Sequence, residues 1–513
     1  MLAFTHLGVS LWGWGLLVPG LLAVYWLLWT IYARFLHPYA KFPGPFLASV
    51  SRAWIVIDIL KGQTHVTQAA LHKRYGSIVR IAPNELAISD ASAIRKIYSV
   101  NSGFTKTDFY LPIRPTFASP DLFTELNETA HATKRKILNN IYTMSSILAS
   151  ETAIDTCTDL FMARMDEFAE QDTPVNLTGW SQWYASDVIG HLFLGSKFGF
   201  MEQRRDVDGY IASIDALLPV QAAACVIPAY LRPLFFASGR LVGFLKRASR
   251  AAARFEEVSA RCVIERMESI DLTKDDGFNP DILTKLLRIC RDEEDMHGFS
   301  AADAQAEVWV GLAAGGDTTA TAISSILYYL MKTPDALRRL YTEIDSATAA
   351  AKLSRPRIKY SEAIKLPYLV ACCKEGMRMH PSVGFTLPRV VPKGGCLVAG
   401  HWLPGGLRVG VNAAIVHFDQ SVFGDDADEY NPDRWFRDDA VNMERYMFQF
   451  GAGSRTCVGK NIALCEIHKL VAEILRSYRI SLVNPQAKRE SRNYWLHLPR
   501  ETLIHIEKRR LGV

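Results

Sequence analysis

The chain has 513 residues, of which 49% are apolar and 22% charged, and this composition fits a folded protein with a sizeable core and one to three domains. Its net charge of +5 is too small to indicate nucleic-acid binding. Nine cysteines, an odd number without Cys-x-x-Cys spacing, fit neither a disulfide framework nor a zinc site. We therefore expect the main body of the chain to lie in a reducing compartment.

An uncharged apolar segment occupies residues 7–33 and contains twelve Leu, Ile or Val residues. It exceeds the roughly 20 residues that a membrane-spanning helix needs. A cleaved signal peptide is the alternative, but its apolar core would be shorter, and no small-residue cleavage site precedes Arg34. Three cations, Arg34, Lys41 and Arg52, follow before the first acidic residue, which places the body on the cytoplasmic side. We expect a single-pass anchor that contacts membrane lipid.

Two prolines around a glycine come next, in Phe42-Pro43-Gly44-Pro45. Proline ends a helix and stiffens the chain, so residues 34–50 are predicted to be a hinge between the anchor and a body at 51–513. Residues 78–88 alternate apolar and polar side chains around the turn at Pro83-Asn84, which predicts a β-hairpin.

Residues 101–130, which include Tyr110, lack periodicity and are predicted to form a long loop, either functional or a plain connector. Helical patterns then run from His131 to about residue 270. Sixteen uncharged residues lie between Asp215 and Arg232, interrupted by two prolines. This stretch is too short and kinked to span a bilayer, so it is either a buried helix or a lid that touches the membrane.

A long helix is predicted for residues 301–332, because Ser300 and Asp303 form a capping pattern and Pro334 follows its end. Its middle reads Ala-Gly-Gly-Asp-Thr-Thr at 314–319. Two glycines inside a helix cost about 1 kcal/mol each, and a buried acid costs more, which indicates a functional site rather than a simple kink. The Thr318 hydroxyl could bind dioxygen or water, the Asp317 carboxylate could relay protons, and the glycines could let a flat cofactor approach.

Two scaffold patterns follow. Glu375 and Arg378 lie three residues apart and therefore on one face of a helix. The segment 383–389 alternates apolar residues and fits a strand, with Arg389 at its end.

The segment 450–459 reads Phe-Gly-Ala-Gly-Ser-Arg-Thr-Cys-Val-Gly and is followed by good helix formers. Glycine lets the backbone approach a flat ligand closely, and Cys457 near a helix N-terminus is predicted to favour its thiolate form. One use of such a thiolate is as the axial ligand of haem iron. A buried structural cysteine is the alternative. A phosphate-binding loop is excluded because Thr456 stands where that motif requires glycine.

The pattern of 450–459 resembles the haem-binding signature of the cytochrome P-450 superfamily position for position. Residues 314–319 resemble its oxygen-handling motif, and Glu375-x-x-Arg378 with Arg434 resembles its structural triad. The family more often has Glu and Phe where this chain has Asp433 and Trp435. The motifs occur in family order, which implies a mainly α fold with a small β region, plus one N-terminal transmembrane helix.

The resemblance also implies a cofactor and a set of site residues. The cofactor would be haem b, iron protoporphyrin IX, with Cys457 as the axial ligand of the iron. Thr318 and Asp317 would be catalytic and deliver protons. Further cofactor contacts would come from Arg135, His131, Arg389, Arg455, Phe450 and Gly451. Contacts with the substrate would come from Tyr110, Ala314, Val383, Phe385, Thr386 and Trp495.

The implied activity is monooxygenation of a hydrophobic small molecule with O2. Electrons would come from NADPH through a separate membrane-bound reductase, because the chain has no flavin or nicotinamide fingerprint. The style of the sequence resembles anchored fungal enzymes of secondary metabolism in the endoplasmic reticulum membrane, which implies a terpenoid or polyketide substrate. Desaturation, ring formation or rearrangement on the same fold, a haem sensor without turnover, and a haem-free scaffold stay open as alternatives.

Overall fold

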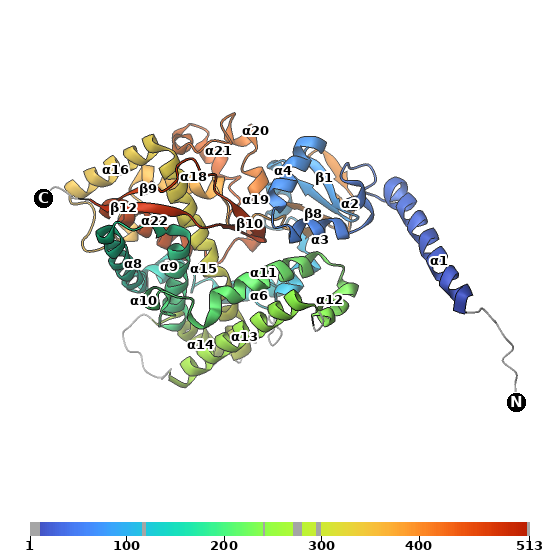
Figure 1. The fold of residues 1–513 in the computed structure, drawn as a ribbon, viewed down its shortest axis with the longest axis horizontal. Helices are drawn as coiled ribbons and strands as arrows, with labels where there is room; N and C mark the ends of the chain where they lie inside the picture. Colours follow the sequence, from blue (N-terminus) through green and yellow to red (C-terminus); the bar gives the residue numbers. More distant parts are fainter. Residues whose placement is uncertain (1–10, 115–119, 240–241, 270–279, 294–298, 510–513) are drawn as a thin grey trace.

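The computed structural model describes residues 11–114, 120–239, 242–269, 280–293 and 299–509. Helix α1 (Leu11–Ile31) projects away from the body and continues into a short π-helix, η1 (Tyr32–Leu36) (Figure 1). The segment Leu17–Leu36 is long and apolar enough to cross a membrane. Only 6% of its 18-residue apolar stretch is buried inside the protein. Leu21 and Leu27 on α1 are 62% and 61% exposed. Of the predicted anchor, residues 7–10 lie outside the described part.

The predicted hinge packs tightly against the body. Tyr39 and Phe42 are buried in one cluster with strand residues of the β region. The amide of Arg80 donates to the Pro43 carbonyl at 2.8 Å, and a Cβ added to Gly44 would overlap the Arg80 carbonyl. The 34–50 segment is therefore docked against the β region and does not act as a free linker. Three helices follow it: α2 (Phe46–Val50), α3 (Ala53–Leu60) and α4 (Thr64–Tyr75).

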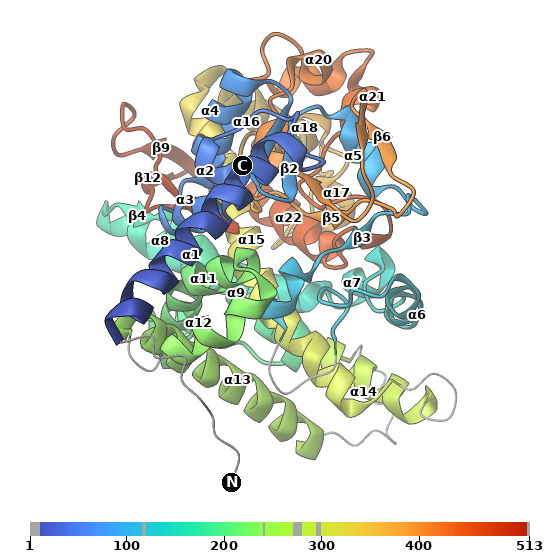
Figure 2. The ribbon, with the colours of Figure 1, turned by 90° about the vertical axis from the view of Figure 1, so that its right-hand side faces the viewer.

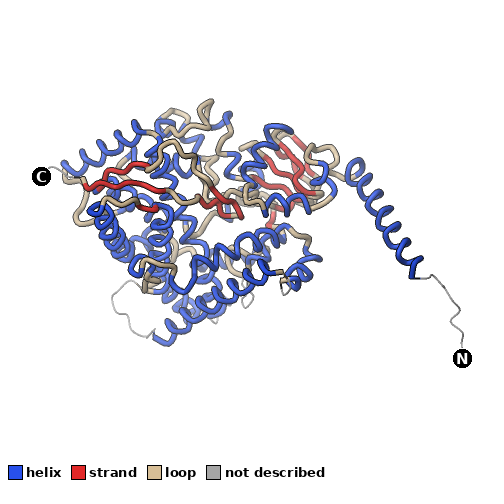
Figure 3. Tube along the Cα trace, in the orientation of Figure 1, coloured by secondary structure: helices blue, strands red, loops and turns tan. Residues whose placement is uncertain are grey.

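A five-stranded sheet forms the β region beside α1, in the order β1-β2-β8-β5-β3 (Figure 3). The predicted hairpin is confirmed, because Ile78 pairs antiparallel with Ile88. The strands of this sheet are β1 (Ile78–Ala82), β2 (Glu85–Ile88), β3 (Thr105–Lys106), β5 (Arg389–Val390) and β8 (Arg408–Val411). The remaining strands are β4 (Val175–Asn176), β6 (Cys396–Val398), β7 (His401–Leu403), β9 (Tyr478–Leu482), β10 (Ser491–Tyr494), β11 (Leu496–Pro499) and β12 (Leu503–Lys508).

Helices make up most of the body. Those between the β region and the long helix are α5 (Ser92–Tyr98), α6 (Glu128–Leu138), α7 (Met144–Ala149), α8 (Glu151–Gln171), α9 (Leu177–Leu194), α10 (Phe200–Gln203), α11 (Tyr210–Val226), α12 (Arg232–Ser238), α13 (Gly243–Ser269) and α14 (Ile282–Glu293). Those after it are α16 (Pro334–Ala349), α17 (Tyr360–Ala363), α18 (Pro367–Met379), α19 (Ala413–Val416), α20 (Gln420–Phe423), α21 (Ala440–Glu444) and α22 (Lys460–Ser477).

The long helix α15 (Ala301–Lys332) has the predicted bounds, and the reciprocal Ser300–Asp303 capping box begins it. It passes through the body and packs against α9, α13, α18 and α22 (Figure 2). An added Cβ would lie 2.5 Å from Ile189 at Gly315 and 2.5 Å from Ser186 at Gly316. Both neighbours belong to α9. The glycines therefore allow close helix packing, and Gly315 also lines the internal cavity, so the approach of a flat cofactor stays a prediction.

A buried ion-pair network ties α18 to η5 (Pro432–Phe436). Arg378 bonds both oxygens of Glu375 at 2.8 and 3.0 Å, and Arg434 Nε reaches Glu375 Oε1 at 3.1 Å. The three side chains are fully buried. Trp435 Nε1 donates to the second carboxylate oxygen at 3.0 Å. Tryptophan at this position thus adds a donor to the network, which phenylalanine would lack.

Candidate active site

The cysteine loop is shaped by two glycines with positive φ. Gly451 has φ 68° and Gly453 has φ 64°. A Cβ added to Gly453 would overlap the carbonyl of Tyr98, so a larger residue would not fit there. The Cys457 amide donates to the Phe450 carbonyl at 2.8 Å, which closes the loop shortly before α22 begins. This geometry turns the Cys457 side chain toward an internal cavity, where the side chain is accessible.

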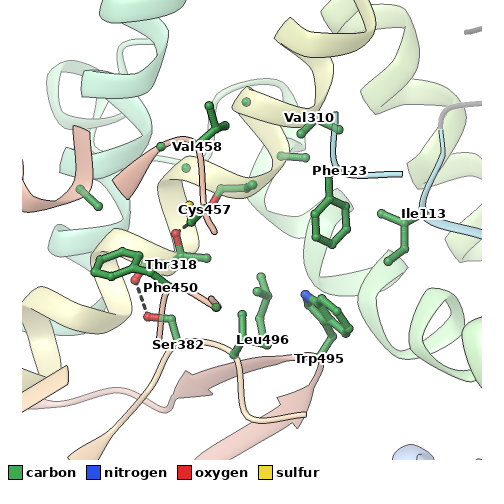
Figure 4. A pocket seen from close by; sticks show the side chains of 18 of the residues that line it. Ile113, Phe123, Val310, Thr318, Ser382, Phe450, Cys457, Val458, Trp495 and Leu496 are labelled. Atoms are coloured by element: carbon green, nitrogen blue, oxygen red, sulfur yellow. Dashed lines mark hydrogen bonds between the residues drawn. The ribbon is translucent and has the colours of Figure 1, made fainter. Parts of the chain in front are cut away.

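The cavity lies between this loop, α15 and the tip of the β10–β11 hairpin. Figure 4 shows Cys457, Thr318, Phe123 and Trp495 around it. Phe450, Gly451 and Arg455 of the loop also line it. The predicted loop residue, oxygen-handling residue and hairpin-tip residue, which are far apart in the sequence, are therefore brought to one space.

Cationic and imidazole side chains from three segments line one part of the cavity: Lys106, His131, Arg135 and Arg455. Burial, and then the guanidinium groups of Arg389 and Arg455, hold the pKa of Lys106 well below its usual range. Burial, and then Arg455, Lys106 and Arg135, lower the pKa of His131 to about 3. Buried cations that repel one another are stabilised by an added anion. The cluster is therefore suited to carboxylate groups of a ligand.

Hydrogen bonds orient the two arginines of this cluster. Arg135 Nη1 donates to the Thr456 carbonyl at 3.0 Å, which links α6 directly to the cysteine loop. Arg455 pairs with Glu128 at 2.9 Å and donates to the Glu125 carbonyl at 2.8 Å. The predicted pair His131 and Arg135 and the loop residue Arg455 are thus brought together at the same wall. Lys106 was missed in the sequence because a lone lysine in a short strand carries no pattern.

Arg389 is buried beside this cluster but is not a wall residue. Its Nη1 donates to the Tyr110 hydroxyl at 2.7 Å and to the Pro388 carbonyl at 3.0 Å. Tyr110 is also off the wall and packs edge-on against Phe123, which does line the cavity. The charge of Arg389 therefore lowers the pKa of Lys106 in the cluster, and Tyr110 supports the position of Phe123 on the cavity wall.

Thr318 and Asp317 point to different sides of α15. Thr318 lines the cavity, its hydroxyl donates to the Ala314 carbonyl at 2.8 Å, and Ser382 Oγ donates to the Thr318 carbonyl at 2.7 Å. Asp317 is buried off the cavity, and its Oδ1 accepts from Gln182 of α9 at 2.7 Å. Oδ2 of Asp317 has no hydrogen-bond partner among the described residues. Burial raises the pKa of Asp317 to about 6, so this carboxyl exchanges protons near neutral pH.

The sequence predicts that Cys457 favours its thiolate form, and the surroundings of the thiol support this only in part. Burial raises the pKa of its thiol, while the backbone N–H groups of Gly459 and Lys460 and the Arg135 guanidinium act in the opposite direction. The N–H groups of the loop and Arg135 therefore favour ionisation of the thiol but do not outweigh the effect of burial. A bound metal cation would complete the ionisation, because a coordinating thiol is deprotonated.

Four of the six predicted substrate contacts line the cavity: Ala314, Val383, Phe385 and Trp495. Tyr110 and Thr386 do not. The Thr386 hydroxyl exchanges hydrogen bonds with the amide of Gln68 at 3.0 and 3.2 Å, so its polar group is used inside the protein. Of the strand predicted at 383–389, only Arg389 belongs to a strand, β5, and Val383 and Thr386 form isolated bridges. Val383, Phe385 and Leu387 line the cavity, and the intervening Thr386 does not.

The sequence reading missed the wall that α11 contributes. Residues Ile214, Leu217, Leu218, Gln221, Ala222 and Cys225 line the cavity from one helical stripe. Their spacing of three and four residues was present in the sequence and could have identified this face. Within the stretch between Asp215 and Arg232, Ala223 and Val226 of α11 are buried, whereas Tyr230 and Leu231 are 81% and 42% exposed. The buried helix therefore describes α11, and the lid that touches the membrane stays a prediction.

Comparison with known proteins identifies the family. The cytochrome P-450 family profile matches residues 43–506. The chain belongs to the cytochrome P-450 family. It is 39% identical to the cytochrome P-450 monooxygenase gsfF of Penicillium aethiopicum, over 94% of this chain and 96% of that protein. It is 33% identical to a pisatin demethylase of Fusarium vanettenii, over 95% and 94% of the two chains, and 33% identical to the monooxygenase cicH of Emericella nidulans, over 91% and 93%.

Members of this cytochrome P-450 family carry haem, and the cavity fits it. The accessible thiol of Cys457 provides a soft donor for iron, and Arg135 and Arg455 provide counter-charges for the two propionates. Lys106 and His131 provide further nitrogen donors beside them. Gly451 and Phe450 supply loop surface beside the thiol. The protein is therefore an oxidoreductase of the monooxygenase class that receives electrons from a redox partner.

Proposed function

We propose that this cytochrome P-450 hydroxylates or otherwise oxidises a hydrophobic intermediate of fungal secondary metabolism. Electrons would come from NADPH through a separate membrane-bound reductase. The observation that carries the proposal is the cavity itself, where Cys457 on one wall faces Thr318 of α15 and mainly apolar side chains surround the space between them (Figure 4). The monooxygenase names of the relatives support the reaction class. The name pisatin demethylase, given to the Fusarium protein, supports a secondary-metabolite substrate.

The haem, when bound, supplies the activation of O2, and the chain supplies position and protons. Thr318 presents its hydroxyl to the cavity, where it can turn from the Ala314 carbonyl and hydrogen-bond to a ligand or water. Asp317 takes up protons on the α9 side of α15, because its Oδ2 is without a partner among the described residues and its pKa is near neutrality. The apolar wall excludes water and so limits wasteful proton uptake.

Replacing Thr318 with alanine should uncouple NADPH use from product formation. The variant loses the hydroxyl that can hydrogen-bond to a water or ligand in the cavity and so direct protons there. Product per NADPH should therefore fall on the order of 10- to 100-fold, while hydrogen peroxide rises. Thr318→Ser keeps the hydroxyl and should retain most coupling. Thr321→Ala, at a buried α15 position off the cavity wall, is the matched control and should behave like the wild type. The assay measures NADPH, peroxide and product in microsomes that contain the protein and a reductase.

Unchanged coupling in Thr318→Ala would remove this residue from the mechanism. A protein that binds candidate pathway intermediates but forms no product from any of them would instead support a haem sensor. Mass spectrometry of the products distinguishes hydroxylation from desaturation, ring formation or rearrangement on the same site.

We further propose that α1 anchors the protein in the endoplasmic reticulum membrane, with the catalytic body in the cytosol. The exposed apolar surface of α1 and the cations that follow it support this orientation. The full chain should therefore stay in the membrane fraction after alkaline carbonate extraction. Protease added to sealed microsomes should degrade the body. Release by carbonate, or protection of the body from protease, would contradict the anchor or its orientation.

A further inference from the structure

The α11 stripe along the cavity has one polar member. Ile214, Leu217, Leu218, Ala222 and Cys225 are apolar or weakly polar, whereas Gln221 carries an amide with two donors and an acceptor. Gln221 is half-buried, and its side-chain amide forms no hydrogen bond with any residue that the structure describes. Because buried polar groups form hydrogen bonds, a glutamine amide on an apolar wall with no protein partner is available to bind polar atoms of a ligand.

Trp495 provides a second polar group on the wall, and it packs in the same hydrophobic cluster as Ala222 and Cys225 of α11. Its ring is half-buried, and its indole nitrogen faces the cavity (Figure 4). Within the described part of the chain, Nε1 of Trp495 has no acceptor. An indole N–H only donates, so the group that it binds must carry an acceptor atom such as a carbonyl or ether oxygen.

The backbone of Trp495 is held in an unusual conformation. Its φ is +86°, a value that a large side chain rarely adopts, at the tip between β10 and β11. The ring stacks on Phe109 at 5.1 Å and meets Phe123 edge-on at 6.0 Å. The Gly384 amide also donates to the Trp495 carbonyl at 3.3 Å. Strained residues that neighbours hold firmly in place are concentrated at ligand sites.

Aromatic side chains surround the indole on the cavity side. Phe123 and Phe385 line the cavity together with Trp495, and their ring centres lie 6.0 and 6.1 Å from the indole. Aromatic rings bind other rings by offset stacking and edge-to-face contact, which a saturated skeleton cannot reproduce. This side of the cavity therefore favours a flat aromatic ligand.

The charge of the wall favours an uncharged ligand over an amine. Glu307 is the one carboxyl side chain among the described wall residues. Burial, and then the charge of Asp121, raise the pKa of Glu307 to about 8, so this group is mostly neutral at pH 7. A cationic ligand would therefore find no ionised carboxylate among the described wall residues.

We propose that the cavity selects a flat, uncharged aromatic substrate that carries a carbonyl or similar oxygen, with Trp495 and Gln221 as the residues that bind its oxygen atoms. This inference rests on the proposed function and narrows its substrate class: an oxygenated aromatic compound of polyketide type is favoured over a saturated terpenoid. Phe123 and the indole face of Trp495 bind the ring, the indole N–H donates to the carbonyl oxygen, and the Gln221 amide binds a second oxygen.

The test uses three compounds with one carbon skeleton: fluorenone, fluorene and perhydrofluorene. Fluorenone has aromatic rings and a carbonyl, fluorene lacks the carbonyl, and perhydrofluorene lacks the aromatic rings as well. Dissociation constants are measured from the change of the haem absorption spectrum of the full-length holoenzyme. The wild type should bind fluorenone about 10-fold more tightly than fluorene, and fluorene more tightly than perhydrofluorene.

Two variants separate the hydrogen bond from the ring contacts. Trp495→Phe keeps an aromatic ring but removes the donor, so it should lose most of the preference for fluorenone over fluorene and keep the affinity for fluorene within about twofold. Gln221→Leu removes the unpaired amide and should strengthen the binding of fluorene and perhydrofluorene. Trp402→Phe, at an exposed position on β7 that is 55% accessible, is the matched control and should change none of the constants. The reduced carbon-monoxide spectrum shows that each variant is folded.

Equal affinities for the three compounds, no spectral response to fluorenone, or a Trp495→Phe variant that weakens fluorenone and fluorene equally would overturn the selection by Trp495. In those cases the proposed monooxygenase function still stands if the enzyme oxidises another hydrophobic compound with NADPH and reductase. That function itself fails if the haem-loaded enzyme and reductase form no oxidised product from any substrate.

Discussion

Replacing Cys457 with alanine should abolish the reduced carbon-monoxide absorption band that is typical of thiolate-bound haem, and all substrate oxidation with it. The cysteine loop places this thiol in the cavity at a position that the positive φ angles of Gly451 and Gly453 define. The methyl side chain of alanine at position 457 has no atom that can bind iron in place of the sulfur. The effect is therefore a complete loss, and difference spectroscopy of the reduced protein measures it.

A matched control is available in the same cavity. Cys225 also lines the wall, but from α11, and burial holds the pKa of its thiol far above the usual range. Cys225→Ala should keep the band, because a thiol that resists ionisation is a poor metal ligand. Survival of the band in Cys457→Ala, or its loss only in Cys225→Ala, would contradict the assignment of the axial ligand.

Removing Arg378 should destabilise the whole body, because Glu375 would lose its closest counter-charge while buried. Arg378 also donates to the carbonyls of His417, Ala427 and Glu429, and so connects α18 to the segment that leads to the cysteine loop. Breaking a buried ion pair from one side costs about 3–5 kcal/mol. We expect Arg378→Leu to lower the free energy of unfolding by about this amount and to lose haem, as measured by denaturant unfolding and the absorption spectrum.

The chain provides an exposed pair with the same spacing as a control. Arg338 and Asp335 lie three residues apart on α16 at 2.9 Å, and their side chains are 74% and 85% exposed. Removing a surface pair of this kind costs about 0–1 kcal/mol, so Arg338→Leu should leave stability and haem content nearly unchanged. Equal effects of the two substitutions would show that burial of the Glu375–Arg378 pair does not set its importance.

Local patterns predicted several elements correctly for reasons that lie within short segments. The Ser300–Asp303 cap and the proline after Lys332 set the bounds of α15. The Pro83-Asn84 turn joins β1 to β2 as an antiparallel pair, as predicted. The predicted grouping of Glu375, Arg378 and Arg434 is confirmed, and Trp435, where the family more often has phenylalanine, donates a hydrogen bond to Glu375.

Other features depend on neighbours far along the chain, which local patterns do not reveal. The direction in which Gly315 and Gly316 face α9 is set by helix packing, which the glycines themselves do not reveal. Thr386 faces Gln68, 318 residues away in the sequence, and its polar group is therefore withdrawn from the cavity. The predicted hinge at 34–50 carries Tyr39 and Phe42, whose buried site against the β region depends on strands far along the chain.

By itself the sequence determined which residues are able to do the chemistry: a cysteine in a glycine loop, a threonine and an acid in the middle of a long helix, and an apolar anchor before the body. These signals are local because capping, glycine conformation and residue chemistry act over a few positions. Only the tertiary structure decided which side chains face the cavity and how their charges interact, as with the Lys106 cluster, Gln221 and Trp495. Burial and the distance between charges set those properties, and both arise when distant segments pack together.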